Sequence, residues 1–136
     1  MPKVLRFRVQ KLIRDGLPAI MRAQGLAVFD RVLAPDEHRA ALAAKLVEEA
    51  RELAEAEGPQ HVLEELADVA EVMAALIDAH GLTPQAVEAA RIAKRAERGG
   101  FEGATWNAAV AAEEGAPALA YYLARPAQYP PEEAEA

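Results

Sequence analysis

The sequence predicts an all-α protein, an antiparallel helical bundle built on one hairpin of two long helices. Apolar residues make up 52% of the 136 residues, whereas aromatic residues make up only 5%. Alanine supplies many of the apolar positions, which favours helices that pack closely through small side chains. In the central part of the chain the apolar residues recur at helical spacing, and Gly or Gly-Pro breaks divide it into segments of helix length.

The N-terminal part carries weaker signals. Residues 5–10 alternate between apolar and polar, which predicts a short strand or an extended arm. Residues 27–33 also favour a β conformation and are a candidate partner for it. Between them, the run from Asp15 to Pro18 predicts a short helix, which Gly25 ends. We therefore expect a bundle that begins with a short extended or β segment.

Three longer helices are predicted in the middle of the chain. Pro35 opens the first, and Gly58-Pro59 separates the first from the second. Gly81 ends the second, and the N-cap Thr83 followed by Pro84 opens the third. These signals predict helices over residues 35–57, 60–80 and 84–98.

The C-terminal part is harder to assign. Short helices are predicted over residues 107–114 and 116–124, and beyond them the composition turns to Pro and Glu. We predict one domain over residues 1–124, followed by a Pro/Glu-rich tail over 125–136. One hairpin and one further helix cover their apolar faces poorly, so we also expect a homodimer or a homotetramer.

Composition excludes several classes of protein and site. There is no Cys, so neither a disulfide scaffold nor a thiolate metal site is present. The net charge of −7 argues against binding to a nucleic-acid polymer. No apolar run, Val72 to Ile77 included, approaches the length of a bilayer span, and no signal peptide is visible. We therefore expect a cytoplasmic protein with no membrane partner.

Acidic pairs on the two predicted long helices are the most informative feature. Acidic residues three apart are common on solvated helix faces, which is the ordinary interpretation. On a helical wheel, however, Glu49 borders the apolar stripe of the first helix, and Glu52 lies just outside it. Glu65 falls between Val72 and Leu76 on the second helix, inside an apolar stripe. A carboxylate in that position needs a partner, because an unpaired buried charge costs several kcal/mol.

The heights of the two pairs along the hairpin also agree. Glu49 and Glu52 lie about eight residues before the Gly58-Pro59 turn, and Glu65 and Asp68 lie about eight residues after it. At 1.5 Å per residue both pairs stand roughly 12 Å from the turn. Four carboxylates this close repel one another unless cations lie among them. Oxygen ligands without His or Cys favour Mg²⁺, with Mn²⁺ as the alternative, over Zn²⁺.

The acidic segments of the two predicted long helices resemble the signature of a known protein family. The segments Glu48-Glu49-x-x-Glu52 and Glu65-x-x-Asp68 resemble the EExxE…ExxD signature of the MazG-like all-α nucleoside triphosphate pyrophosphohydrolases. Four further segments resemble a subgroup of predicted house-cleaning pyrophosphohydrolases: Lys11 to Pro18, Lys45 to Glu49, Asp68 to Val72 and Lys94 to Phe101. The resemblance covers about residues 10 to 103. It departs at Gly16, where the family usually has Lys, and in the sequence after Gly103.

The resemblance implies hydrolysis of a nucleoside triphosphate to the monophosphate and pyrophosphate, which clears non-standard or excess nucleotides. It implies that Mg²⁺ is held by Glu49, Glu52, Glu65 and Asp68, and that Glu48 acts beside them in catalysis, together with Glu49. Two alternatives stay open: the related phosphoribosyl-ATP pyrophosphohydrolase, and a non-catalytic helical module that binds metal or nucleotide.

Phosphates that metal does not hold need cationic side chains. The candidates are Lys11, Arg14, Lys94 and Arg98. For the last two, an alternative is that basic residues complement the dipole at the end of a helix. His38, His61 and His80 share no ligand spacing, and we assign them no catalytic role.

Overall fold

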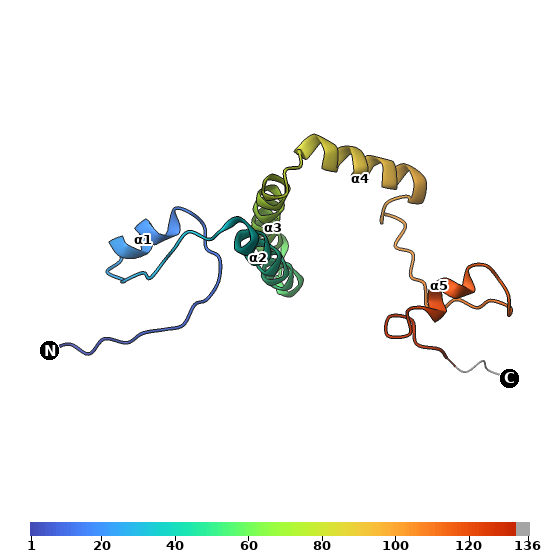
Figure 1. Ribbon diagram of the computed structural model, residues 1–136, viewed down its shortest axis with the longest axis horizontal. Helices are drawn as coiled ribbons and strands as arrows, with labels where there is room; N and C mark the ends of the chain where they lie inside the picture. The colour runs from blue at the N-terminus through green and yellow to red at the C-terminus, as the bar shows by residue number, and fades with distance from the viewer. Residues whose placement is uncertain (133–136) are drawn as a thin grey trace. The chain divides into compact units, whose positions relative to one another are not determined.

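The computed structural model describes residues 1–132, and all of its regular secondary structure is helical (Figure 1). The predicted all-α class is therefore confirmed. The five helices are α1 (Leu17–Ala23), α2 (Pro35–Glu55), α3 (Pro59–Ala79), α4 (Pro84–Arg98) and α5 (Leu119–Leu123). Within residues 1–132, no helix combines the length and the hydropathy that crossing a bilayer requires.

The N-terminal segment forms a short helix but no sheet. Pro18 lies in the first turn of α1, and Gly25 follows its end with a positive φ of 87°, as predicted. Residues 5–10 and 27–33 form no strand, so the strand alternative and its pairing are wrong, and the extended arm over residues 5–10 stays a prediction. No backbone hydrogen bond joins these two stretches. The physical reason is that an isolated pair of short strands, without a third strand or a covering helix, is not stable by itself.

Helices α2 and α3 pack against each other as an antiparallel hairpin (Figure 1). The N-terminus of α2 is capped by Glu37, whose carboxylate accepts a hydrogen bond from the Ala34 N–H at 3.4 Å. The turn contains Gly58 with φ of 81°, a left-handed conformation that favours glycine, and Pro59 then opens α3. Both helices agree with the predicted bounds within two residues.

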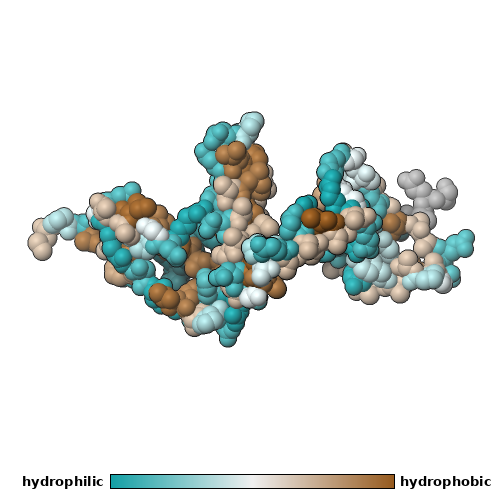
Figure 2. Space-filling model, turned by 90° about the horizontal axis from the view of Figure 1, so that it is seen from above, coloured by the Kyte–Doolittle hydropathy of each residue, from teal (hydrophilic) through white to brown (hydrophobic). Residues whose placement is uncertain are grey.

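The hairpin buries little apolar surface. Leu42 and Val72 are the only buried hydrophobic residues among those described, and Glu49 is the only buried charged residue. Apolar side chains are visible on the surface of the molecule in Figure 2. On the hairpin they include Val47, Leu63, Leu66 and Met73.

The described chain divides into two compact units, and the division falls between Arg98 and Gly99. In the second unit the helix predicted over 107–114 is wrong, because this stretch is irregular. The helix predicted over 116–124 is confirmed only as α5. No turn of 107–114 buries an apolar face, and helices this short depend on such packing for their stability. The domain predicted over 1–124 stays a prediction, and residues 133–136 of the predicted tail lie outside the described residues.

Candidate metal centre

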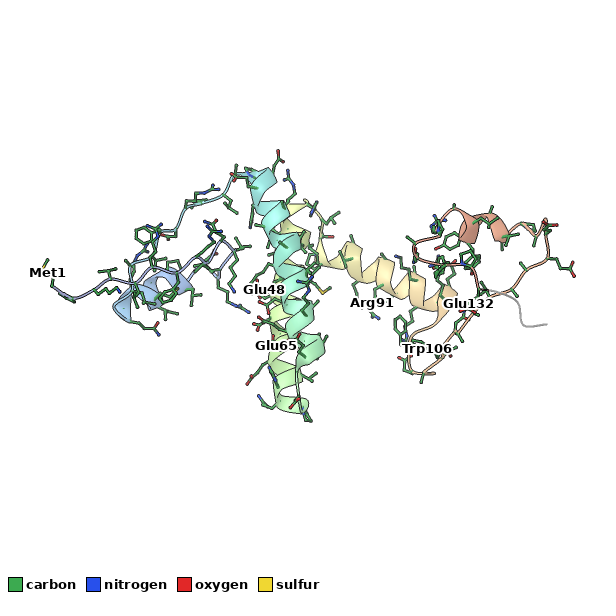
Figure 3. The ribbon with its side chains drawn as sticks, turned by 90° about the horizontal axis from the view of Figure 1, so that it is seen from below. Met1, Glu48, Glu65, Arg91, Trp106 and Glu132 are labelled. Atoms are coloured by element: carbon green, nitrogen blue, oxygen red, sulfur yellow. The ribbon has the colours of Figure 1, made fainter. Side chains whose placement is uncertain are left out.

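The hairpin brings together three of the four carboxylates predicted as metal ligands. One carboxylate oxygen from each of Glu49, Glu65 and Asp68 lies within 4.8 Å of the other two. Glu49 comes from α2, and the other two residues come from successive turns of α3. Figure 3 shows Glu48 and Glu65 on neighbouring stretches of the hairpin. Because the turn at Gly58 is short, residues that are equally far from it along the sequence lie at the same level on α2 and α3.

Two of these carboxylates are withdrawn from water. Glu49 is only 6% exposed, and the side chain of Glu65 is only 14% exposed. The Oε2 atoms of both are buried and have no hydrogen-bond partner. A buried oxygen acceptor without a partner is costly, and a divalent cation is the partner that a cluster of carboxylates fits. The donor set and its burial therefore fit a hard cation.

Burial raises the pKa of the Glu49 carboxyl, and the neighbouring Glu52 raises this pKa further, while Lys45 opposes the shift. Glu52 thus lies close enough to repel Glu49, although its own side chain is exposed and it is not one of the three converging residues. Its predicted role as a fourth ligand stays a prediction.

Glu48 has a different environment from Glu49. Its Oε1 lies 2.9 Å from Nζ of Lys11 and 3.5 Å from Nζ of Lys45, which also lies 3.3 Å from Glu49 Oε1. The hydrogen bond from Lys11 lowers the pKa of Glu48, and the same contact raises the pKa of Lys11. Lys45 is half-buried and was not among the residues predicted to bind metal or phosphate. Two adjacent glutamates therefore differ: Glu49 is buried and contacts one lysine, whereas Glu48 is less buried and contacts two.

The N-terminal segment supplies further positive charge to the site. Nη2 of Arg14 lies 2.7 Å from Oδ1 of Asp68 and donates a hydrogen bond to it. A cleft beside the cluster is lined by this segment and by α2, with Gln10, Lys11, Leu12, Ala41, Ala44, Lys45 and Glu48 as its lining. Two of the four predicted phosphate-binding residues, Lys11 and Arg14, thus contact the acidic site.

The other two predicted phosphate-binding residues are not brought to it. Lys94 and Arg98 are exposed on α4, and Nε of Arg98 lies 3.9 Å from Glu97. Within residues 1–132 no ion pair joins either of them to the carboxylates of the hairpin. Their role stays a prediction.

One neighbour of the cluster was not identified from the sequence. Nε2 of His61 lies 3.4 Å from Oε1 of Glu65. The spacing of four residues within one predicted helix is the signal that could have found this pair, because such residues lie on the same face.

An all-α hairpin that carries ExxE on one helix and ExxD on the next, with three of these four carboxylates converging, defines the class of MazG-like pyrophosphohydrolases. Residues 26–95 match the model of one family in this superfamily, described as phosphoribosyl-ATP pyrophosphohydrolase. The match spans more than half of the chain, so the chain belongs to this family, and the resemblance seen in the sequence is confirmed. The chain is accordingly a pyrophosphohydrolase, a hydrolase of acid anhydrides. Comparisons with curated proteins and with solved structures gave no match.

The site predicts that divalent metal stabilises the fold. At a Mn²⁺ concentration of about 100 times the dissociation constant, binding adds ~2.7 kcal/mol of stability, which raises Tm by roughly 5–15 °C. Glu49→Gln abolishes this rise, and it raises Tm without metal because it removes a desolvated charge. Differential scanning fluorimetry with and without Mn²⁺ measures both effects.

The matched control is Glu64→Gln, which removes an exposed carboxylate beside Glu65 and keeps the full response to Mn²⁺. An equal rise of Tm in Glu49→Gln would show that the cation binds elsewhere.

Proposed function

We propose that the protein hydrolyses a nucleoside triphosphate to the monophosphate and pyrophosphate, with Mg²⁺ or Mn²⁺ as cofactor. The observation that carries the proposal is the convergence of Glu49, Glu65 and Asp68, two of which have a buried oxygen without a hydrogen-bond partner. The family supports the cleavage of a phosphoanhydride bond. A nucleotide substrate also favours the cytoplasm as the location.

The acidic residues of the site would bind the cation, and the basic residues would bind the phosphates of the substrate. Glu49, Glu65 and Asp68 would hold the cation, and Glu52 would complete the set. When bound, Mg²⁺ neutralises negative charge on the phosphate oxygens and activates water for attack. Lys11 and Arg14 would bind phosphate oxygens that the cation does not reach. The ionised carboxylate of Glu48 lies between Lys11 and Lys45, a position suited to orienting these cations and the attacking water.

Two observations bear on the substrate. The family match favours phosphoribosyl-ATP, which carries the same triphosphate group. The N-terminal segment favours the house-cleaning activity, because Lys11 to Pro18 resembles that subgroup and lies outside the matched residues 26–95. Within this segment, Lys11 and Arg14 contact the acidic site. We therefore propose the house-cleaning reaction first and phosphoribosyl-ATP as the second candidate.

Pyrophosphate release tests the function. The full chain is incubated with nucleoside triphosphates, deoxynucleoside triphosphates and phosphoribosyl-ATP, with and without Mg²⁺, and phosphate is measured after treatment with a pyrophosphatase. We expect turnover that depends on Mg²⁺. Glu65→Gln lowers kcat/KM about 100-fold or more, because the charge on the phosphates is no longer neutralised. Glu64→Gln leaves kcat/KM unchanged.

Nucleotide binding by calorimetry without any pyrophosphate release would support the non-catalytic alternative instead. Faster turnover of phosphoribosyl-ATP than of every simple triphosphate would support the second candidate.

The ion pair between Arg14 and Asp68 predicts a role for Arg14 with substrate. Arg14→Gln raises KM about 10-fold, the loss expected for one charge-assisted hydrogen bond to phosphate. Arg8→Gln removes an exposed cation from the same segment and serves as the control. Steady-state kinetics with the preferred nucleotide measure the difference, and an unchanged KM in Arg14→Gln would exclude this role.

The uncovered apolar face of α3 supports the proposed homodimer or homotetramer. At roughly 100° per residue, Leu63, Leu66 and Met73 fall within about 80° of one another, and the middle of this face lies more than about 100° from both Glu65 and Val72. The three apolar side chains are 45% to 60% exposed in the chain alone. A second copy that packs against this face would remove its apolar surface from water.

Light scattering after size-exclusion chromatography tests this association. We expect the mass of two or four chains of 14.6 kDa each. Leu66→Glu shifts the mass toward one chain, because it places a charge in the apolar contact. Ile20→Glu, at a position of similar exposure on α1, is the control and leaves the mass unchanged. A single-chain mass for the unmodified protein would contradict the proposal.

A further inference from the structure

His61 touches both the hairpin turn and a carboxylate of the acidic cluster. It lies in the first turn of α3, where its Nδ1 accepts a hydrogen bond from the backbone N–H of Glu57 at 3.3 Å. Its Nε2 lies 3.4 Å from Oε1 of Glu65. The ring itself is not among the three residues whose oxygens converge. The ring therefore contacts one residue of the cluster and is not itself one of the converging groups.

The hydrogen bond at the turn determines which ring nitrogen carries the proton. A neutral imidazole has one donor nitrogen and one acceptor nitrogen. Because Nδ1 accepts the Glu57 N–H, the ring hydrogen is on Nε2, the atom that faces Glu65 Oε1. The two oxygens of Glu65 are thereby distinguished: Oε1 faces a donor, and Oε2 is buried without a hydrogen-bond partner.

We propose that His61 is a positioning residue that holds Glu65 with one oxygen turned to the imidazole and the other left for the divalent cation. The inference rests on the proposed metal-dependent function. A glutamate side chain has three rotatable bonds, so fixing one oxygen lowers the entropy that cation binding would otherwise cost. Since the ring is itself held by the turn, it links the geometry of this ligand to the connection between α2 and α3. Partners of this kind behind metal ligands commonly change metal affinity 10- to 100-fold.

The chain contains a matched pair without a site. Gln60 and Glu64 have the same spacing on the same helix, and Nε2 of Gln60 donates to Oε1 of Glu64 at 3.3 Å. Both residues are exposed, and Glu64 is not in the cluster. If the His61 contact only stabilised the helix, removing either pair would have the same effect. This pair also shows that a glutamine reaches a glutamate four residues later.

The test measures Mn²⁺ affinity of the full-length protein by electron paramagnetic resonance of the free ion, which does not depend on turnover. His61→Leu weakens Mn²⁺ binding about 10-fold. His61→Gln restores the affinity to within about 3-fold of the unmodified chain, because its amide donates at the same spacing. Gln60→Leu leaves the affinity unchanged. Circular dichroism at 222 nm verifies that each variant is folded.

The outcomes separate the inference from the function on which it rests. If the unmodified chain binds no Mn²⁺, the metal-dependent function and the role of His61 both fail. If it binds Mn²⁺ and His61→Leu binds equally well, only the role of His61 fails. Equal weakening in His61→Leu and His61→Gln would assign the effect to the volume of the ring and overturn the proposal. If His61→Leu does not fold, the affinity of His61→Gln decides the outcome. A Mn²⁺ affinity of His61→Gln clearly below that of the unmodified chain would overturn the proposed role of His61.

Discussion

The desolvation of two carboxylates in one helical hairpin is the constraint on which this structure depends. Glu49 and Glu65 lie on different helices, yet each has an oxygen that neither water nor a hydrogen-bond donor reaches. Such an arrangement exists only if the register of the hairpin is fixed, and the turn at Gly58 fixes it. The raised pKa of Glu49 expresses the same cost, since burial disfavours its charged form. The carboxylates that weaken the isolated chain are the groups that a divalent cation would bind.

Positive charge reaches this site from the irregular N-terminal segment and not from the hairpin alone. Among the lysines and arginines of α2 and α3, both within the described residues, only Lys45 forms ion pairs with the carboxylates of the site. Lys11 and Arg14 approach from a stretch without regular structure. These ion pairs hold the N-terminal segment against α2 and α3 in a chain that buries few hydrophobic residues. Since the ion pairs are partly exposed, each adds little to stability. In the proposed function, these ion pairs would place cations near the phosphate oxygens of the substrate.

The sequence was most informative where local signals act. The helices begin and end where the backbone preferences of Pro35, Gly58 and Pro59 require it. The hairpin and the height of its acidic pairs were therefore predictable from the sequence. The conformation of residues 5–10 and 27–33 was not predictable in this way. Alternating apolar and polar residues also occur in irregular segments that make side-chain contacts. The contact between His61 and Glu65 depends on rotamers, and spacing alone did not distinguish it from a solvated pair. Whether Lys94 and Arg98 reach the acidic site depends on how α4 packs, and no local sequence pattern determines that packing.

The part of the site outside the matched residues 26–95 bears on how members of this family could differ in substrate. The carboxylates lie on the two helices that the family model covers, so the proposed cation binding and phosphoanhydride cleavage would belong to the shared part. Lys11 and Arg14 precede it and still contact Glu48 and Asp68. Gly16, where the house-cleaning subgroup usually has Lys, lies two residues after Arg14 and leaves that position without a cation. In the proposed function, the chemistry common to the family and the recognition particular to this chain would therefore reside on different segments, which meet at the acidic site.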